Sequence, residues 1–276
     1  MELEQNADRI RLQGLGIVAI SYDSVEATRQ FTERAHLSFP LLSDTDSAVI
    51  KHYGILNDTV DPKSAFYGIP FPGTYLVDAK GVITAKYFED DYKSRDTSAS
   101  ILLRQFGLNP VPAHQPVAAK HIGLSTSATG TEARTGQRLT LTVDADLAAR
   151  MHVYAPGVMQ GYIPIGLTFE KTAGFTPDAP VYPASKMLRL PVIKETVPVF
   201  AGKFRVQQTI RMADAAELEP LLDKDRNLTV TAKFRYQACD DKECYVPETV
   251  PLTWVVHVQP LDRVRVSADA QKKANQ

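Results

Sequence analysis

Both cysteines of this 276-residue chain, Cys239 and Cys244, lie in one short stretch, so any thiol chemistry of the chain takes place there. Only Asp-Asp-Lys-Glu separates them, and a tight turn of that length brings two sulfurs within bonding distance. The flanking residues, 228–236 and 250–258, alternate apolar and polar side chains with the period of β-strands. We therefore predict a β-hairpin in which each cysteine stands where a strand meets the turn.

Three interpretations of the cysteine pair are open. A structural disulfide that closes so short a loop would stabilise the fold by only about 2 kcal/mol. A metal site needs more ligands than two thiolates, and the nearest histidine in sequence is His257, so we expect neither a metal nor a cofactor. The third interpretation, which we favour, is a redox pair that opens and closes by thiol–disulfide exchange.

The turn between the cysteines is acidic. Asp240, Asp241 and Glu243 surround the two sulfurs with negative charge. Negative charge raises the pKa of a thiol and slows its attack as a nucleophile. A slow thiol suits a domain on which a faster partner acts.

The composition limits the possible functions. A chain of 276 residues with 44% hydrophobic residues suggests two domains, each with its own core. Lys and Arg total 31 against 32 for Asp and Glu, a net charge of -1 that argues against a nucleic-acid partner. No apolar stretch is long enough for stable membrane insertion. The first residues lack the basic flank and apolar centre of a signal peptide.

The first third of the chain alternates predicted helices and strands. We expect helices over 2–14, 25–35 and 44–53, and strands over 15–21 and 39–43. Ser24 is the expected N-cap of the second helix, and Gly54 is expected to end the third. Strands that directly follow helices in this way are typical of a parallel sheet in an α/β fold.

Three motifs occur in order in this part: Val18-Ala-Ile-Ser-Tyr-Asp-Ser24, Phe39-Pro-Leu-Leu-Ser-Asp44 and Tyr53-Gly-Ile55. Over residues 1–106 the chain resembles the middle of a peroxiredoxin of the AhpC/TSA type, which has the thioredoxin-like fold. The resemblance implies a domain over 1–108 that is truncated at its amino terminus. The first strand and the peroxidatic cysteine of that family precede the position matched by Glu2, and no cysteine occurs here before Cys239.

A further stretch, from Gly68 to Ile83, resembles the central hairpin of thioredoxin-like proteins, with Asp78-Ala-Lys-Gly81 as its turn. By that resemblance Pro72 is the cis-proline, and Phe71 and Pro72 contact the backbone of a bound partner. Many peroxiredoxins place an arginine at this position. Having Pro72 instead favours disulfide exchange over peroxide reduction.

The sequence changes character after a predicted helix over 98–106. We expect a stiff linker over 109–119, which is rich in proline. Residues 120–262 read as an all-β sandwich of immunoglobulin type, with Trp254 between its sheets and a tail over 263–276. The expected strands are 122–128, 138–143, 152–155, 165–170, 187–193 and 202–211, followed by the two strands of the cysteine hairpin.

The cysteine hairpin carries a second resemblance, through Tyr236-Gln-Ala-Cys239 and Cys244-Tyr-Val-Pro247. Over residues 120–260 the chain is similar to the amino-terminal domain of the DsbD thiol:disulfide interchange proteins. The resemblance implies that Cys239 and Cys244 shuttle electrons with a thioredoxin-like partner, which Tyr236 and Tyr245 contact. It also places the loop that caps the cysteines near residues 186–195. His152 we interpret as a packed or edge histidine and not a catalytic base.

The sequence as a whole favours a thiol–disulfide oxidoreductase that passes reducing equivalents through Cys239 and Cys244. One alternative is an antioxidant peroxidase whose peroxidatic cysteine lies upstream of this chain. Another is a non-catalytic binding module with a structural disulfide. The DsbD resemblance suggests a periplasmic or exported protein although no signal peptide is visible, and the sequence does not order the two sulfurs.

Overall fold

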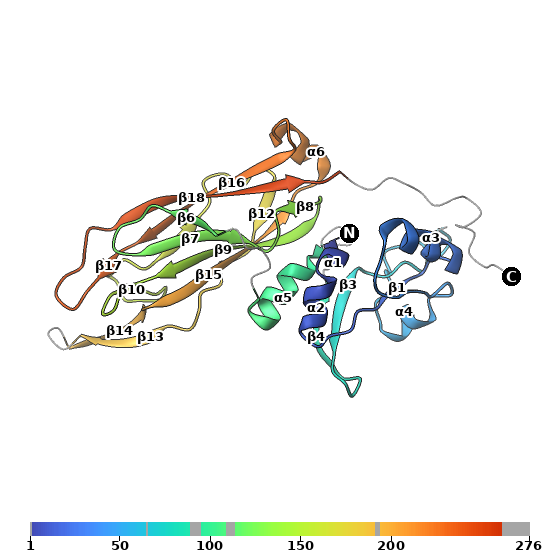
Figure 1. Ribbon diagram of the computed structural model, residues 1–276, viewed down its shortest axis with the longest axis horizontal. Helices are drawn as coiled ribbons and strands as arrows, with labels where there is room; N and C mark the ends of the chain where they lie inside the picture. Colours follow the sequence, from blue (N-terminus) through green and yellow to red (C-terminus); the bar gives the residue numbers. More distant parts are fainter. Residues whose placement is uncertain (1, 65, 89–94, 109–113, 191–193, 261–276) are drawn as a thin grey trace. The chain divides into compact units, whose positions relative to one another are not determined.

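The computed structural model describes residues 2–64, 66–88, 95–108, 114–190 and 194–260 (Figure 1). Its internal contacts divide the chain into two units, one that runs to Leu102 and one from Leu103 to Pro260. Residues 109–113 of the predicted linker and the whole predicted tail lie outside the described residues. Each unit is considered by itself.

The first unit has the predicted alternation of helices and strands. Strands β1 and β2 pair in parallel, with Ile20 opposite Leu42, which confirms the predicted parallel pairing. Strands β3 and β4 form the predicted antiparallel hairpin around the turn at Asp78. The elements are α1 (Glu2–Gln5), α2 (Ala7–Leu12), β1 (Ala19–Ser21), α3 (Val25–Ala35), β2 (Leu41–Ser43), α4 (Ala48–His52), β3 (Gly73–Val77), β4 (Ile83–Phe88), β5 (Arg95–Asp96) and α5 (Ser98–Phe106), which continues past Leu102.

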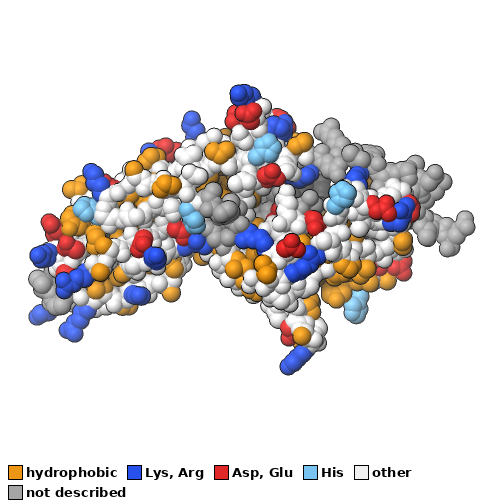
Figure 2. Space-filling view, in the orientation of Figure 1, with side chains coloured by type: hydrophobic (Ala, Val, Ile, Leu, Met, Phe, Trp, Pro, Cys, Tyr) orange, Lys and Arg blue, Asp and Glu red, His pale blue; other side chains and the backbone are white. Residues whose placement is uncertain are grey.

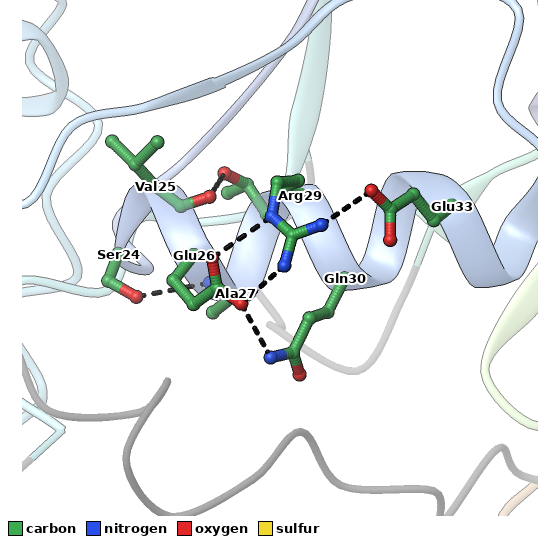
Figure 3. A network of polar contacts seen from close by, with 8 residues as sticks. Ser24, Val25, Glu26, Ala27, Arg29, Gln30 and Glu33 are labelled. Atoms are coloured by element: carbon green, nitrogen blue, oxygen red, sulfur yellow. Dashed lines mark hydrogen bonds and ion pairs between the residues drawn. The ribbon is translucent and has the colours of Figure 1, made fainter.

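Helix α3 begins and ends where the sequence predicts, and its first turn is capped by Ser24. The Ser24 hydroxyl accepts a hydrogen bond from the backbone N–H of Ala27 at 3.1 Å. Along the exposed side, Arg29 pairs with Glu26 at 2.7 Å and with Glu33 at 2.6 Å (Figure 3). The hydrogen bonds from Arg29 lower the pKa of Glu26 to about 2. The single helix predicted over 2–14 is instead two short helices.

The prediction of a cis-proline at Pro72 is wrong. Its peptide bond is trans, since the described residues contain no cis peptide bond. The backbone N–H of Phe71 donates to the carbonyl of Ile55 at 2.8 Å, and Pro70 pairs with Leu56 as an isolated bridge. The segment therefore runs extended, the conformation that the residue before a proline prefers.

The second unit is built from three sheets. One has the strand order β12-β15-β9-β7-β6, a second β11-β16-β18-β8, and a third β13-β14-β10-β17. The strands are β6 (Gln115–Val117), β7 (Gly123–Ala128), β8 (Glu132–Ala133), β9 (Gln137–Asp146), β10 (His152–Tyr154), β11 (Gly166–Thr168), β12 (Phe175–Pro177), β13 (Lys186–Leu190), β14 (Glu195–Phe200), β15 (Lys203–Met212), β16 (Asn227–Tyr236), β17 (Ala238–Cys239) and β18 (Glu248–Val258). Helix α6 (Ala215–Leu218) and the 3-10 helix η1 (Glu219–Leu221) connect β15 to β16.

The core of this unit lies between the first two sheets. Strand β16 buries alternate residues, among them Val230 and Phe234, which are both fully buried. Trp254 of β18 is 5% exposed, and its indole N–H donates to the carbonyl of Ser127, in β7 of the facing sheet, at 2.9 Å. The predicted position of this tryptophan between the sheets is confirmed.

Several strands of the second unit differ from the prediction. Strands β8, β12 and β14 were not expected, and β6 lies inside the predicted linker. Three of these strands contain proline: Pro116 in β6, Pro177 in β12 and Pro198 in β14. Proline cannot donate a hydrogen bond to the ladder and argues against a strand, which is why the sequence pattern missed them.

Figure 2 shows acidic and basic side chains intermixed over the visible face, in keeping with a net charge of -1. Among the described residues, the helices are too short and too polar for any of them to cross a membrane.

The burial of Phe234 in the core predicts a large loss of stability when this residue is replaced. Replacing it with alanine (Phe234→Ala) removes a fully buried ring, so we expect the free energy of unfolding of this unit to fall by about 3–5 kcal/mol. The fluorescence of Trp254, the single tryptophan, reports urea unfolding of this unit alone. Thr231→Ala, at an exposed position of the same strand, is the control and should change stability by less than about 0.5 kcal/mol. Equal effects would contradict the assigned core.

Candidate functional site

The chain changes sheets just before the first cysteine. Strands β16 and β18 pair from Asn227 opposite His257 to Tyr236 opposite Glu248, as the predicted hairpin requires. After Gln237 the chain leaves this ladder, and β17 pairs with β10 in the third sheet. The prediction that Cys239 stands at the end of the hairpin strand is therefore wrong, because Cys239 lies in a separate sheet.

The two cysteines form a disulfide, with Cα atoms 4.0 Å apart. Their surroundings differ sharply. Cys239 is 1% exposed, whereas Cys244 is exposed. The predicted proximity is confirmed, and the bond joins a buried cysteine to an exposed one. No group of His, Cys, Asp or Glu side chains is placed to hold a metal ion in the part of the chain that the structure describes.

The acidic turn has a structural role that the sequence did not reveal. The carboxylate of Asp240 accepts the backbone N–H groups of Lys242 at 2.7 Å and Glu243 at 2.9 Å, and the hydroxyl of Tyr245 at 2.9 Å. The hydrogen bonds from these N–H groups hold the pKa of Asp240 below its usual value, with a further contribution from Tyr245. Asp241 pairs with Arg150 at 3.1 Å on the surface.

Tyr245 anchors the chain immediately after Cys244. Its backbone N–H donates to the carbonyl of Ala238 at 2.9 Å, and its carbonyl accepts from the side chain of Gln237 at 3.0 Å. Its ring stacks on His121, with centroids 3.8 Å apart and planes 7° from parallel. The half-buried Tyr245 thus fixes the exposed cysteine from one side.

Tyr154 approaches both sulfurs. Its hydroxyl lies 3.4 Å from Sγ of Cys244 and 3.6 Å from Sγ of Cys239. Tyr154 is 4% exposed, and this burial raises its pKa, so its hydroxyl stays protonated and can donate a hydrogen bond. The sequence analysis did not single out Tyr154, because 85 residues separate it from Cys239 and only the pairing of β10 with β17 brings them together.

Aromatic and aliphatic side chains enclose the buried side of the bond. The ring of Tyr162 lies 4.6 Å from that of Tyr154, and its hydroxyl donates to the carboxylate of Glu195. This hydrogen bond raises the pKa of Tyr162 to about 12. Leu188 and Leu190 of β13 pack against the cluster that contains Cys239. They lie in the segment where a capping loop was expected, and its residues 191–193 lie outside the described residues.

The prediction that Tyr236 contacts a partner needs correction. Its side chain is buried, with 1% of the residue exposed. Its hydroxyl lies against the carboxylate of Glu248 and the carbonyl of Lys120, the latter at 2.8 Å. Burial, reinforced by Glu248, raises the pKa of this phenol. Tyr236 therefore joins strand ends in the core. Phe71 and Pro72 belong to the first unit, and their contact with a partner stays a prediction.

Two families match separate parts of the chain. Residues 1–86 match the AhpC/TSA family, and residues 124–253 match the family described as thiol:disulfide interchange protein DsbD, N-terminal. The first part of the chain is thus similar to the AhpC/TSA family and the second part to the DsbD N-terminal family. The predicted fold classes, thioredoxin-like and then an immunoglobulin-like β-sandwich, are thereby confirmed.

Curated relatives of the AhpC/TSA region include the putative peroxiredoxin bcp of Coxiella burnetii, 39% identical over 26% of this chain and 47% of that protein. Peroxiredoxin Bcp of Escherichia coli K12 is 31% identical over 33% of this chain and 57% of its own length. The chloroplastic peroxiredoxin Q of Sedum lineare is 32% identical over 29% of this chain and 40% of that protein. The chain thus spans about half the length of the curated relatives it matches.

Two solved structures are similar in part. The N-terminal periplasmic domain of ScsB from Proteus mirabilis has a TM-score of 0.36 and 8% identity, covering 52% of each chain. The reduced DsbD n-terminal domain of Neisseria meningitidis has a TM-score of 0.30 and 14% identity, covering 57% of this chain and 98% of that one. At such scores neither structure carries weight for function.

The hydrogen bonds of Asp240 predict a pH dependence for the stability of the second unit. Because its pKa is lowered in the folded state, this carboxylate stabilises the fold above its unfolded pKa of about 3.9, and the stabilisation is lost as the pH falls through the lower folded value. Asp240→Asn should therefore lower the urea midpoint at pH 7 and flatten its decline below about pH 5.

The urea midpoints are read from Trp254 fluorescence between pH 7 and pH 2.5. Asp225→Asn, at an exposed aspartate of the same domain, is the matched control. If Asp225→Asn flattened the decline as much as Asp240→Asn did, the turn would not be its source.

Proposed function

We propose that the DsbD N-terminal domain exchanges electrons with a thioredoxin-like partner through the Cys239–Cys244 bond. The observation that carries this proposal is the asymmetry of the disulfide, in which an exposed cysteine is joined to a buried one. A purely structural bridge does not need one reachable sulfur, whereas exchange does, because the attacking thiolate approaches along the S–S axis. The match of residues 124–253 to the DsbD N-terminal family supports the same activity.

The reaction begins at Cys244. A partner thiolate attacks its Sγ, the S–S bond breaks, and the bonding electron pair leaves with Cys239 as a thiolate. The mixed disulfide between Cys244 and the partner is then attacked by the second thiol of the partner. This releases Cys244 as a thiolate, which takes up a proton. The partner dithiol is oxidised to a disulfide as this disulfide is reduced, and the reverse sequence passes the electrons on.

Tyr154 assists the departure of Cys239. The Cys239 thiolate forms in a site with 1% exposure, where water cannot solvate it well. The Tyr154 hydroxyl, 3.6 Å from this sulfur, is a donor already in place. A hydrogen bond to a charged group is worth more than one to a neutral group, so the contact strengthens as the bond opens.

Two alternatives are less favoured. Peroxide reduction would need a peroxidatic cysteine upstream of this chain, since residues 1–108 contain no thiol. A non-catalytic module would need a bridge that resists reduction, although Cys244 is exposed. The half-buried Tyr245 beside Cys244, and Phe71 and Pro72 in the other region, remain our proposed partner contacts. Domain limits of 1–108 and 120–262 likewise remain a proposal.

Trapping tests the order of attack. In Cys239→Ser the exposed Cys244 thiol should form a stable mixed disulfide with a thioredoxin that retains one active-site cysteine and has been activated as a disulfide. Cys244→Ser, which leaves only the buried thiol, should form at least about tenfold less of this mixed disulfide. Mass spectrometry identifies the linked cysteine. If neither variant captures thioredoxin, or if the native disulfide resists reduced thioredoxin, the exchange function is wrong.

A second prediction concerns the donor at the buried sulfur. Tyr154→Phe keeps the ring but removes the hydroxyl, so the rate of reduction by dithiothreitol should fall roughly tenfold. Tyr162→Phe is the matched control, since its hydroxyl bonds to Glu195 and not to sulfur. Stopped-flow measurement under native conditions gives both rates. An unchanged rate in Tyr154→Phe would remove this tyrosine from the mechanism.

A further inference from the structure

His152 lies directly beside the buried cysteine. In the antiparallel pairing of β10 with β17 it stands opposite Cys239. Directly opposed residues point to the same face of a sheet, with Cβ atoms about 4.5–5.5 Å apart. His152 is 7% exposed, and its ring meets that of Tyr154 edge-on at 5.6 Å. The imidazole is therefore held on the same face as the sulfur that leaves during exchange.

Burial favours the neutral form of His152 while the disulfide is closed. Burial lowers its pKa, and the carboxylates of Asp241 and Asp240 act in the opposite direction with smaller effect. Opening the disulfide adds a negative charge on Cys239. The titratable and charged groups around the imidazole are then Tyr154 on its own strand, Cys239 on the paired strand, and Asp240 and Asp241 in the turn, the last paired with Arg150.

We infer that His152 is a positioning residue for the Cys239 thiolate: it takes up a proton as the disulfide opens and stabilises the departing sulfur by its charge. The inference rests on the proposed exchange function. When a partner thiolate attacks Cys244, the electron pair of the S–S bond goes to Cys239, and a proton from solvent goes to His152. Re-formation of the bond reverses both events, so Cys239 attacks as a thiolate and His152 returns its proton to solvent.

The size of the effect follows from the separation of the charges. Unit charges about 5–6 Å apart at an effective dielectric constant of about 20 shift an equilibrium by roughly 100-fold as an upper limit. Solvent and the two aspartates reduce this value. A thiol of lowered pKa is also a weaker nucleophile, which offsets part of the gain in thiolate population. We therefore expect about a fivefold effect on the rate at which Cys239 attacks near pH 6.

The experiment uses the reduced full chain and an aromatic disulfide that releases a coloured thiolate. The exposed Cys244 reacts first and releases one equivalent. Cys239 then attacks the mixed disulfide on Cys244 and releases the second. The rate of this second release between pH 5 and pH 9 reports the thiolate of Cys239. In His152→Gln it should be about fivefold slower than in the wild type near pH 6 and equal to it above about pH 8.

Two further variants make the test specific. His257→Gln, at a half-buried histidine of β18, should leave the profile unchanged. His152→Phe retains a ring for packing but no charge, so it should behave like His152→Gln. Recovery of the wild-type profile by His152→Phe would show a packing role and overturn the inference.

The outcomes separate the two proposals. If the wild type gives no second release at any pH, the exchange function itself fails. If the second release occurs with the same pH profile in wild type and His152→Gln, only the role of His152 fails. Should the variants not fold, NMR titration of His152 in the wild type decides the matter, since its pKa must rise when the disulfide is reduced. An unchanged pKa would overturn the inference.

Discussion

The site depends on a change of sheet between Tyr236 and Ala238. Up to Tyr236 the chain pairs with β18, and from Ala238 it pairs with β10. That change takes Cys239 out of the ladder of β16 and β18 and into a second apolar cluster, where it is 1% exposed. A continuous hairpin would expose both cysteines alike. Because the turn returns to the surface at Cys244, one bond connects a buried cysteine with an exposed one.

Hydrogen bonds independent of the disulfide hold this geometry. The carboxylate of Asp240 closes the turn, and Tyr245 fastens the following segment to Ala238 and, by stacking, to His121. At the base, the hydroxyl of Tyr236 joins Glu248 to Lys120. These contacts should keep the turn in the same shape when the disulfide opens. A site that changes little between its oxidised and reduced states is suited to repeated exchange.

The sequence predicted the local features well and the long-range ones poorly. Ser24 at a helix start, the turn at Asp78 and the alternation of residues 228–236 all act through neighbours in the chain, and each appears as expected. What failed depends on pairing between distant segments. Cys239 meets His152 and Tyr154 only through the pairing of two short strands, β17 and β10, and the burial of Tyr236 follows from strand ends that meet in the core. Strand β14 was not predicted because it contains Pro198.

The electrostatics of the site illustrate why composition misleads. The sequence shows an acidic turn and predicts thiols surrounded by negative charge. In the structure the carboxylate of Asp240 is occupied by two N–H groups and a hydroxyl, and Asp241 is paired with Arg150. The groups on the cysteine side of the sheet are a neutral phenol and an imidazole, Tyr154 and His152. A group that donates a hydrogen bond and one that can gain a proton would both favour an anion at Cys239, so these two side chains would counteract the acidic residues of the turn in the proposed exchange.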